Sequence, residues 1–194
     1  MAAIQTINEI MAAHGGFVSK KDLTSSQYHR LLNSVIDGSV VRVRRGVFAL
    51  PTAMANTMYD IGRIVPGGVL CNYTAWSHYG LTTQIPMYIC VAIEQKRKIK
   101  LPAYPPISLS YQSKEQLALG CERANIGGYD VNIFNMERSV CDALKNRNKI
   151  GMDVCAEIIN NYIRRKDRNL NLLSEYAQKL RVGNVLHNYL QLAL

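Results

Sequence analysis

The hydrophobic positions of the first fifty residues alternate between helical and extended spacing. Apolar side chains recur at helical spacing as far as His14-Gly15-Gly16, whose glycines favour a helix end. A short extended piece, a short helix capped by Ser19 and a longer helix over 27–37 are predicted next. Alternating apolar and polar residues on both sides of Arg45-Gly46 then predict a β-hairpin. The predicted order of helix, strand, helix, turn, helix and hairpin is that of a winged helix-turn-helix.

The helix predicted over 27–37, for which Ser25 and Ser26 offer the cap, has one apolar and one polar face. At about 100° per residue, five apolar side chains share the face expected to pack on the first two helices: Tyr28, Leu31, Leu32, Val35 and Ile36. Arginine, asparagine and glutamine side chains are suited to reading base edges in the major groove. The candidate base-reading residues of this helix are Ser26, Gln27, Arg30 and Asn33.

Positive charge is concentrated in the same region. The 194-residue chain has 23 lysines and arginines against 14 aspartates and glutamates, a formal net charge of +9, which favours a polyanionic partner. On charge alone, a basic protein with solvated charges explains the excess equally well. Six cations nevertheless fall in the predicted second helix, third helix and hairpin: Lys20, Lys21, Arg30, Arg42, Arg44 and Arg45. The alternation predicts that Arg42 and Arg44 share one face of the hairpin, opposite its valines. Arg45 at the tip completes a wing that can contact phosphates or enter a minor groove.

Residues 1–55 are predicted to form one domain and residues 56–194 another. The fold class is α+β, with an N-terminal winged helix-turn-helix followed by a mixed α/β domain that ends in a helical bundle. For the first domain, the alternative is an amphipathic helix and a hairpin with ordinary solvated charges, as in winged domains that bind proteins.

Strands and helices follow one another in the second domain. Apolar runs at 87–93 and 107–111 predict strands, and Gly127-Gly128 predicts a hairpin. From Asn135 onward, apolar positions at helical spacing predict a series of helices. The basic run Lys96-Arg97-Lys98-Ile99-Lys100 between the two strands is typical of a solvated loop, and a nucleic-acid contact is the alternative.

Two groups of charged residues stand out in the helical part. Glu137 and Arg138 open a helix, and Asp142 lies four residues after Arg138, so an ion pair along the helix is available. This group is interpreted first as a structural anchor and second as a functional surface. The second group is basic and follows a predicted helix: Arg164, Arg165, Lys166 and Arg168. Cations there interact favourably with the helix dipole, and a contact with nucleic acid is the alternative.

No motif of catalysis or cofactor binding is present in the sequence. The glycine pairs lack the Lys-Ser/Thr of a phosphate-binding loop, and zinc-protease, serine-hydrolase and kinase motifs are missing. The five cysteines are scattered and are expected to be buried free thiols. We therefore expect a protein that is not an enzyme and that uses no cofactor and no metal. Because no apolar run approaches the length of a membrane span and the N-terminus does not resemble a signal peptide, we expect a cytoplasmic protein without membrane contact.

Several runs together resemble one protein family. HGGFVSKKDL, VVRVRRGVFAL, NYTAWSHYGL, and above all NMERSVCDAL followed by KIGMDVCAEIINNY, resemble the AbiEi-like antitoxins of type IV toxin–antitoxin (abortive infection) systems. The resemblance extends over essentially the whole chain. Ser139 and Val140 stand where family members often carry Thr and a Leu or Val, and Phe48 stands where many have Tyr.

The resemblance implies a function for each domain. It implies a winged helix-turn-helix that binds inverted repeats in the promoter of its own operon and represses transcription. It also implies a second domain that counteracts a nucleotidyltransferase-like toxin without a stable complex. The implied DNA contacts are the six cations of the first domain, and the implied signature of the second domain is Glu137, Arg138 and Asp142.

We therefore expect a two-domain antitoxin that also represses transcription. Since no heptad seam is evident, a monomer is expected in solution, with paired operator sites filled by two separate molecules. Two alternatives remain open. One is an enzyme that modifies the toxin or a nucleotide through the second domain, and the other is an RNA-binding module that uses the basic C-terminal helices.

Overall fold

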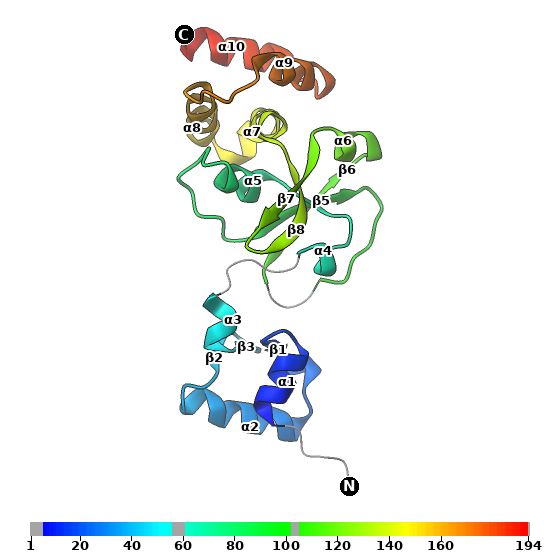
Figure 1. Cartoon of the computed structure of the whole chain (residues 1–194), viewed down its shortest axis with the longest axis vertical. Coiled ribbons are helices and arrows are strands. Elements are labelled where there is room, and N and C mark those ends of the chain that lie inside the picture. The colour runs from blue at the N-terminus through cyan, green and yellow to red at the C-terminus, as the bar shows by residue number, and fades with distance from the viewer. Residues whose placement is uncertain (1–5, 56–60, 102–104, 194) are drawn as a thin grey trace. The chain divides into compact units, whose positions relative to one another are not determined.

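The computed structural model describes residues 6–55, 61–101 and 105–193, which fall into two compact units. The N-terminal unit comprises the described residues 6–55, and the C-terminal unit comprises the remaining described residues (Figure 1). Each unit combines helices with a β-sheet, so the chain is a mixed α+β protein. The expected domain boundary after residue 55 adjoins residues 56–60, which lie outside the described residues.

The N-terminal unit is built from helices around a three-stranded antiparallel sheet of order β1-β3-β2. Its elements in chain order are α1 (Ile7–Ala13), β1 (Phe17–Ser19), the 3-10 turn η1 (Lys20–Asp22), α2 (Ser25–Ile36), β2 (Val41–Arg44), β3 (Val47–Ala49) and α3 (Pro51–Ala55). A hydrophobic core that includes Met11, Leu31 and Phe48 joins α1 and α2 to the sheet. The short helix predicted after Ser19 is a single turn of 3-10 helix.

Helix α2 begins earlier than the sequence pattern predicts, because its N-cap is Thr24. The Thr24 Oγ1 accepts a hydrogen bond from the Gln27 backbone N–H (3.3 Å), and Gln27 Oε1 accepts one from the Thr24 backbone N–H (2.9 Å). This reciprocal pair is a capping box, which requires Ser or Thr three residues before Glu or Gln. The cap predicted at Ser25 and Ser26 is therefore wrong, since neither serine has a glutamine or glutamate three residues later.

The apolar face predicted for α2 is correct except at its C-terminal end. Leu31 is fully buried on this face. Three more of its predicted members pack against the same core: Tyr28, Leu32 and Val35. Ile36, by contrast, is 85% exposed, because α2 ends at this residue and the chain turns at Gly38 with a φ of +79°. Val40, beyond the turn, is buried instead.

The hairpin forms around Arg45-Gly46 as predicted, but its alternation is interrupted by a β-bulge. Arg42 pairs with Phe48 whereas Arg44 pairs with Val47, so the register shifts between the two arginines. Since Phe48 and Val47 are neighbours on β3, the register positions of Arg42 and Arg44 fall on opposite faces of the sheet. The simple alternation from which the sequence places both arginines on one face is therefore interrupted between them. The side chain of Arg44 itself lies outside the described part of the chain.

The C-terminal unit contains a five-stranded mixed sheet of order β6-β5-β4-β8-β7. Its strands are β4 (Val69–Leu70), β5 (Ile89–Glu94), β6 (Ile107–Gln112), β7 (Cys121–Ile126) and β8 (Tyr129–Phe134). β5 runs parallel to β6, and β4 runs parallel to β8, while the other neighbours are antiparallel. The two strands and the hairpin that the sequence predicts correspond to β5, β6 and the pair β7–β8.

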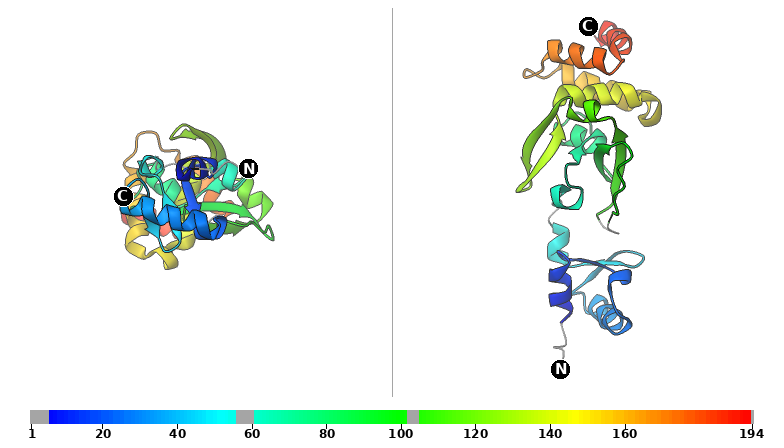
Figure 2. Two further views of the ribbon diagram at one scale, coloured as in Figure 1. Left: turned by 90° about the horizontal axis from the view of Figure 1, so that it is seen from below. Right: turned by 90° about the vertical axis from the view of Figure 1, so that its right-hand side faces the viewer.

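The helices predicted after Asn135 are present and form the main core of this unit. They are α7 (Met136–Ile150), α8 (Met152–Ile163), α9 (Leu170–Lys179) and α10 (Gly183–Ala193). Shorter helices lie between the strands: α4 (Ile61–Ile64), α5 (Asn72–His78) and α6 (Lys114–Ala118). Helix α7 lies across one end of the sheet, with α9 and α10 on the side away from the strands (Figure 2). Trp76 is fully buried, and its Nε1 donates a hydrogen bond to the Ser139 carbonyl (2.8 Å), which ties α5 to α7. None of the helices formed by the described residues is both long and apolar enough to cross a bilayer.

Two glycines with positive φ give a matched test of packing around α7. A Cβ at Gly120 (φ +69°) would lie 2.6 Å from the Arg138 Cβ, whereas a Cβ at Gly128 (φ +87°) would meet nothing within 4 Å. Both alanine substitutions cost about 1–2 kcal/mol of backbone strain, and Gly120→Ala costs about 1–3 kcal/mol more through overpacking. Urea denaturation of the full chain, followed by the fluorescence of the single tryptophan, Trp76, measures both. Equal losses for the two variants would contradict the close contact at Gly120.

Candidate functional site

The N-terminal unit brings the cations of η1 and of the hairpin together. The Lys20 backbone N–H donates a hydrogen bond to the carbonyl of Gly46 at the hairpin turn (2.8 Å). The Lys20 Nζ lies 4.9 Å from the centroid of the Tyr28 ring on α2, which is cation–π distance. One lysine therefore connects η1, the hairpin and α2, the three elements expected to face a duplex.

Tyr28 has a role that the sequence pattern did not indicate. Its spacing predicts a core residue, and its ring does pack edge-on against Phe48 (6.0 Å between centroids). The same ring also supports Lys20. No local signal links a lysine with a tyrosine eight residues later, because their contact depends on the turn between η1 and α2.

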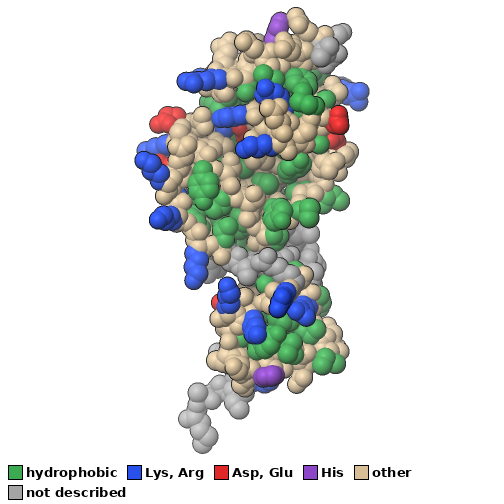
Figure 3. All heavy atoms as spheres, turned by 180° about the vertical axis from the view of Figure 1, so that it is seen from behind, with side chains coloured by type: hydrophobic (Ala, Val, Ile, Leu, Met, Phe, Trp, Pro, Cys, Tyr) green, Lys and Arg blue, Asp and Glu red, His purple; other side chains and the backbone are tan. Residues whose placement is uncertain are grey.

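The exposed cations of this unit remain without carboxylate partners. Lys20, Lys21, Arg42 and Arg45 are all exposed, and no ion pair shorter than 4.0 Å involves them within the described ranges. Figure 3 shows lysine and arginine side chains gathered on one face of the N-terminal unit. When solvated, uncompensated cations of this kind neutralise the phosphates of a polyanion, the counterions of the polyanion are released, which favours binding.

The base-reading candidates on α2 differ in how available their side chains are. Ser26 and Asn33 are exposed, while Arg30 is half-buried although the helical wheel places it opposite the packed face. Gln27 uses its Oε1 twice, as the acceptor for both the backbone N–H and the hydroxyl of Thr24. Of the four candidates, Ser26 and Asn33 therefore present the more accessible polar groups.

The C-terminal end of α2 carries a negative charge. The Ser39 hydroxyl and backbone N–H donate hydrogen bonds to Asp37 Oδ1 (2.6 and 2.9 Å), which lower the pKa of the Asp37 carboxyl. This carboxylate therefore stays ionised near neutral pH. Its charge disfavours a polyanion at the end of the helix, beyond the base-reading candidates.

In the C-terminal unit, Arg138 is fully buried and all parts of its guanidinium are engaged. Its Nε donates to Asp142 Oδ1 (3.1 Å), so the ion pair available from the sequence is formed. The remaining donors reach one side-chain and two backbone oxygens from β6 and the α6 region: Gln112 Oε1 (2.7 Å), the Gln116 carbonyl (2.6 Å) and the Leu119 carbonyl (3.0 Å). The guanidinium also lies 4.3 Å from the centroid of the Phe134 ring. These contacts make Arg138 a structural anchor.

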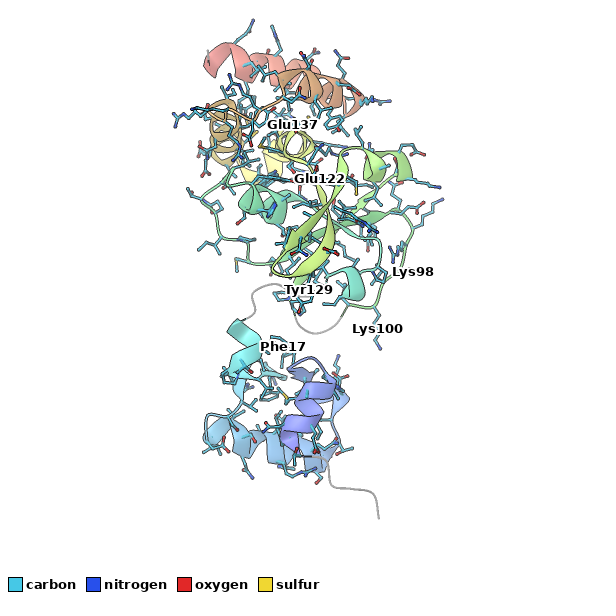
Figure 4. The ribbon with its side chains drawn as sticks, in the orientation of Figure 1. Phe17, Lys98, Lys100, Glu122, Tyr129 and Glu137 are labelled. Carbon is cyan, nitrogen blue, oxygen red and sulfur yellow. The ribbon has the colours of Figure 1, made fainter. Side chains whose placement is uncertain are left out.

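Glu137 lies about 100° around α7 from Arg138 and holds the other helices. Its Oε1 accepts hydrogen bonds from the Tyr162 hydroxyl on α8 and from the Asn169 backbone N–H, each at 3.1 Å. Asn169 is the N-cap of α9. Glu137 therefore fixes the connection between α8 and α9, and Figure 4 shows it among the helices of this unit.

Asp142 has one oxygen that Arg138 does not satisfy. Its Oδ2 is buried and has no hydrogen-bond partner in the described part of the chain. Burial raises the pKa of Asp142, and the charge of Arg138 opposes that shift. Burial and the nearby Asp142 also raise the pKa of the Cys71 thiol.

The cysteines are free thiols, as expected, but not all are buried. Cys71, Cys141 and Cys155 are buried and Cys90 is partly so, whereas Cys121 on β7 is exposed, which contradicts the expectation for that residue. Burial raises the pKa of Cys141 to about 12, so its thiol stays protonated at neutral pH. Within the described residues, no three or more His, Cys, Asp or Glu side chains are grouped as metal ligands would be.

The second basic group divides between structural and solvated residues. Arg165 forms a two-point ion pair with Asp167 (2.9 and 2.8 Å) and donates to the carbonyl of Tyr79 (2.9 Å). Arg168 donates to the carbonyl of Arg165 (2.6 Å). Both therefore shape the turn after α8. The other two members of the group are exposed: Arg164 and Lys166.

Compared with models of known protein families, the sequence matches none, and no curated protein matches it either. A functional proposal therefore depends on the residues described above and on the resemblance in the sequence.

The buried guanidinium gives a sharp stability test. Replacing Arg138 by Met leaves the buried Asp142 and three partly buried oxygens without their donor, so Arg138→Met lowers the free energy of unfolding of the C-terminal unit by about 3–5 kcal/mol. Arg165→Gln removes a partly exposed pair and costs about 1 kcal/mol or less. Urea denaturation followed by Trp76 fluorescence measures both variants. If Arg138→Met costs no more than Arg165→Gln, the anchoring role of Arg138 is wrong.

Proposed function

We propose that this chain is a type IV antitoxin that binds inverted repeats in the promoter of its own operon through the N-terminal unit. In the same proposal, the C-terminal unit counteracts a nucleotidyltransferase-like toxin without a stable complex. The observation that carries the DNA-binding part is the junction at Lys20, which brings the cations of η1, the turn of the hairpin and helix α2 together.

The element order of the N-terminal unit supports a winged helix-turn-helix. In this interpretation η1 and α2 are the helix-turn-helix, α2 is the recognition helix, and β2 and β3 are the wing. The strand order β1-β3-β2 fits, because β1 pairs with β3 and leaves β2 at the edge. The exposed hairpin arginines, Arg42 and Arg45, would then lie on the wing.

The residues divide into two roles on a duplex. Ser26, Arg30 and Asn33 would approach base edges from α2, and Gln27 would contribute its remaining amide group. The cations of η1 and the hairpin would hold phosphates, which set affinity and register but not sequence preference. This second group comprises Lys20, Lys21, Arg42, Arg44 and Arg45.

For the C-terminal unit, we propose a protein-based role without a catalytic step or cofactor. Glu137, Arg138 and Asp142 would act by holding the fold that counteracts the toxin, which their burial supports. We further propose a monomer that works in the cytoplasm, as the resemblance and the sequence suggest.

Two substitutions separate base reading from phosphate binding. Asn33→Ala removes an exposed group on α2 and reduces the preference for promoter DNA over scrambled DNA by about 1–3 kcal/mol. Arg45→Gln weakens both duplexes alike and reduces the salt slope by about 0.9. Salt-titrated fluorescence anisotropy measures both effects. Lys179→Gln, on the exposed Glu175 pair of α9, is the control and leaves binding unchanged. Equal, salt-independent losses for Asn33→Ala and Arg45→Gln on both duplexes would refute the assignment.

Repression and toxin counteraction can be separated in cells. Because the wing belongs to the N-terminal unit, the double variant Arg42→Gln/Arg45→Gln loses repression of a promoter–reporter fusion but still rescues growth when the toxin is expressed from an independent promoter. Reporter activity and growth are measured in the same strains, with immunoblots to show equal protein levels. Loss of growth rescue at wild-type protein level would contradict separate roles for the two units.

A further inference from the structure

The basic strap, defined as residues 96–100, connects two parallel neighbouring strands. β5 and β6 pair in parallel, with Ile89 opposite Ile107 and Glu94 opposite Gln112. The chain that leaves the end of β5 must therefore return along the whole strand length before β6 begins. Each strand has six residues, so at about 3.3 Å per residue this length is roughly 20 Å. Gln95 and Lys96 form a turn after β5, with a φ of +66° at Lys96, and the described residues that follow as far as Leu101 form no helix.

Side chains along the strap alternate between solvent and the protein. Lys96, Lys98 and Lys100 are exposed, while Arg97 and Ile99 are half-buried. Lys98 and Lys100 lie two residues apart beyond the turn that contains Lys96. Figure 4 labels Lys98 and Lys100, which project from this connection at the margin of the C-terminal unit. The strap therefore presents three exposed positive charges, each separated from the next by a half-buried residue.

The inward-facing residues hold the strap in place. The Arg97 backbone N–H donates to the carbonyl of Glu94 (3.3 Å). The Arg97 guanidinium lies against Gly67, where an added Cβ would be 3.8 Å from its NH1 atom. None of the strap cations forms an ion pair shorter than 4.0 Å with a carboxylate in the described ranges. The strap is thus held at Arg97, and no described carboxylate pairs with its positive charges.

An exposed aromatic ring lies beside the start of the strap. Tyr111, on the edge strand β6, is 54% exposed and pairs with Ile93 in β5. Two residues after Ile93, the Gln95 backbone N–H donates to the carbonyl of Gln112 (2.8 Å), so β6 stays beside the chain as far as the residue before Lys96. Several exposed lysines next to an exposed aromatic ring are the combination that binds unpaired nucleic acid, since cations follow the phosphates and bases stack on the ring.

We infer that the basic strap and Tyr111 form a binding surface for single-stranded nucleic acid on the C-terminal unit. Lys96, Lys98 and Lys100 contact successive parts of the phosphodiester backbone, and Tyr111 stacks with an unpaired base. The surface carries no asparagine, glutamine or aspartate in the strap to read base edges, so binding is largely independent of sequence. This activity is separate from duplex recognition by the N-terminal unit.

Anisotropy with the full chain and a fluorescent twelve-nucleotide oligouridine tests the surface. Lys96→Gln/Lys98→Gln/Lys100→Gln lowers the affinity at least about ten-fold at low salt and reduces the salt slope by about 2, because three phosphate contacts are lost. Tyr111→Ala lowers the affinity about five-fold or more without changing the salt slope, since stacking releases no counterions. The control, Lys114→Gln/Lys145→Gln/Lys149→Gln, removes three other exposed lysines of this unit and binds like the wild type.

Further probes distinguish the ligand and the two units. Oligothymidine of the same length shows whether the strand must be RNA, and either result supports the surface. Arg42→Gln/Arg45→Gln weakens promoter duplex binding and leaves oligouridine binding intact, so the two proposals fail separately. Wild-type oligouridine affinity in the strap variant would overturn the inference. Loss of duplex and oligouridine binding to the same degree in the strap variant, with no effect of Tyr111→Ala, would also overturn it, since the strap would then be a duplex contact.

Discussion

A guanidinium without access to water must find all of its partners inside the protein, and Arg138 does so in the C-terminal unit. Its donors reach Asp142 on its own helix, the side chain of Gln112 on β6, and two carbonyls of the α6 region. These contacts fix the first turn of α7 against the sheet. Gly120 is part of the same constraint, because the side chain of any larger residue at this position would collide with Arg138. The arrangement of the sheet and helices in this unit depends on this one buried charge.

Neighbouring residues on α7 join different layers. Arg138 faces the sheet, whereas Glu137 faces the connection between α8 and α9, and the Ser139 carbonyl receives the Trp76 indole of α5. Three consecutive residues thus hold the sheet, the later helices and α5 together. Because each of these three residues makes a contact between layers, this part of the sequence tolerates little change. This gives a structural reason why its motif is recognisable. Its burial favours a role in the fold over direct contact with a partner.

The sequence pattern predicts regular elements well and their ends less well. Helical spacing after Asn135 and the glycine pair at 127–128 suffice for α7 to α10 and the β7–β8 hairpin, because these signals are local. The cap at Thr24 was missed because three candidate cap residues stand in a row, and only the glutamine three residues later selects among them. Ile36 has the right spacing for the core, but periodicity does not show that the helix ends there. Apart from Asp142, the partners of Arg138 lie 19 to 26 residues away in sequence, and no local pattern indicates contacts of that kind.

For the candidate surfaces, exposure is more informative than the number of charges. Arg138 and Arg165 belong to groups that the sequence singled out, yet both use their donors on the protein's own oxygens. Arg45 and Lys98 come from equally basic runs and are exposed without an ion pair to any described carboxylate. A buried cation that loses its partner costs several kcal/mol, so it is not free to exchange that partner for a ligand. A solvated cation gives up only counterions when a phosphate approaches. The surroundings of a basic residue therefore decide whether it serves structure or can serve binding. Each unit keeps solvated cations on short, well-held segments, which are η1 and the hairpin in the N-terminal unit and the basic strap in the C-terminal unit.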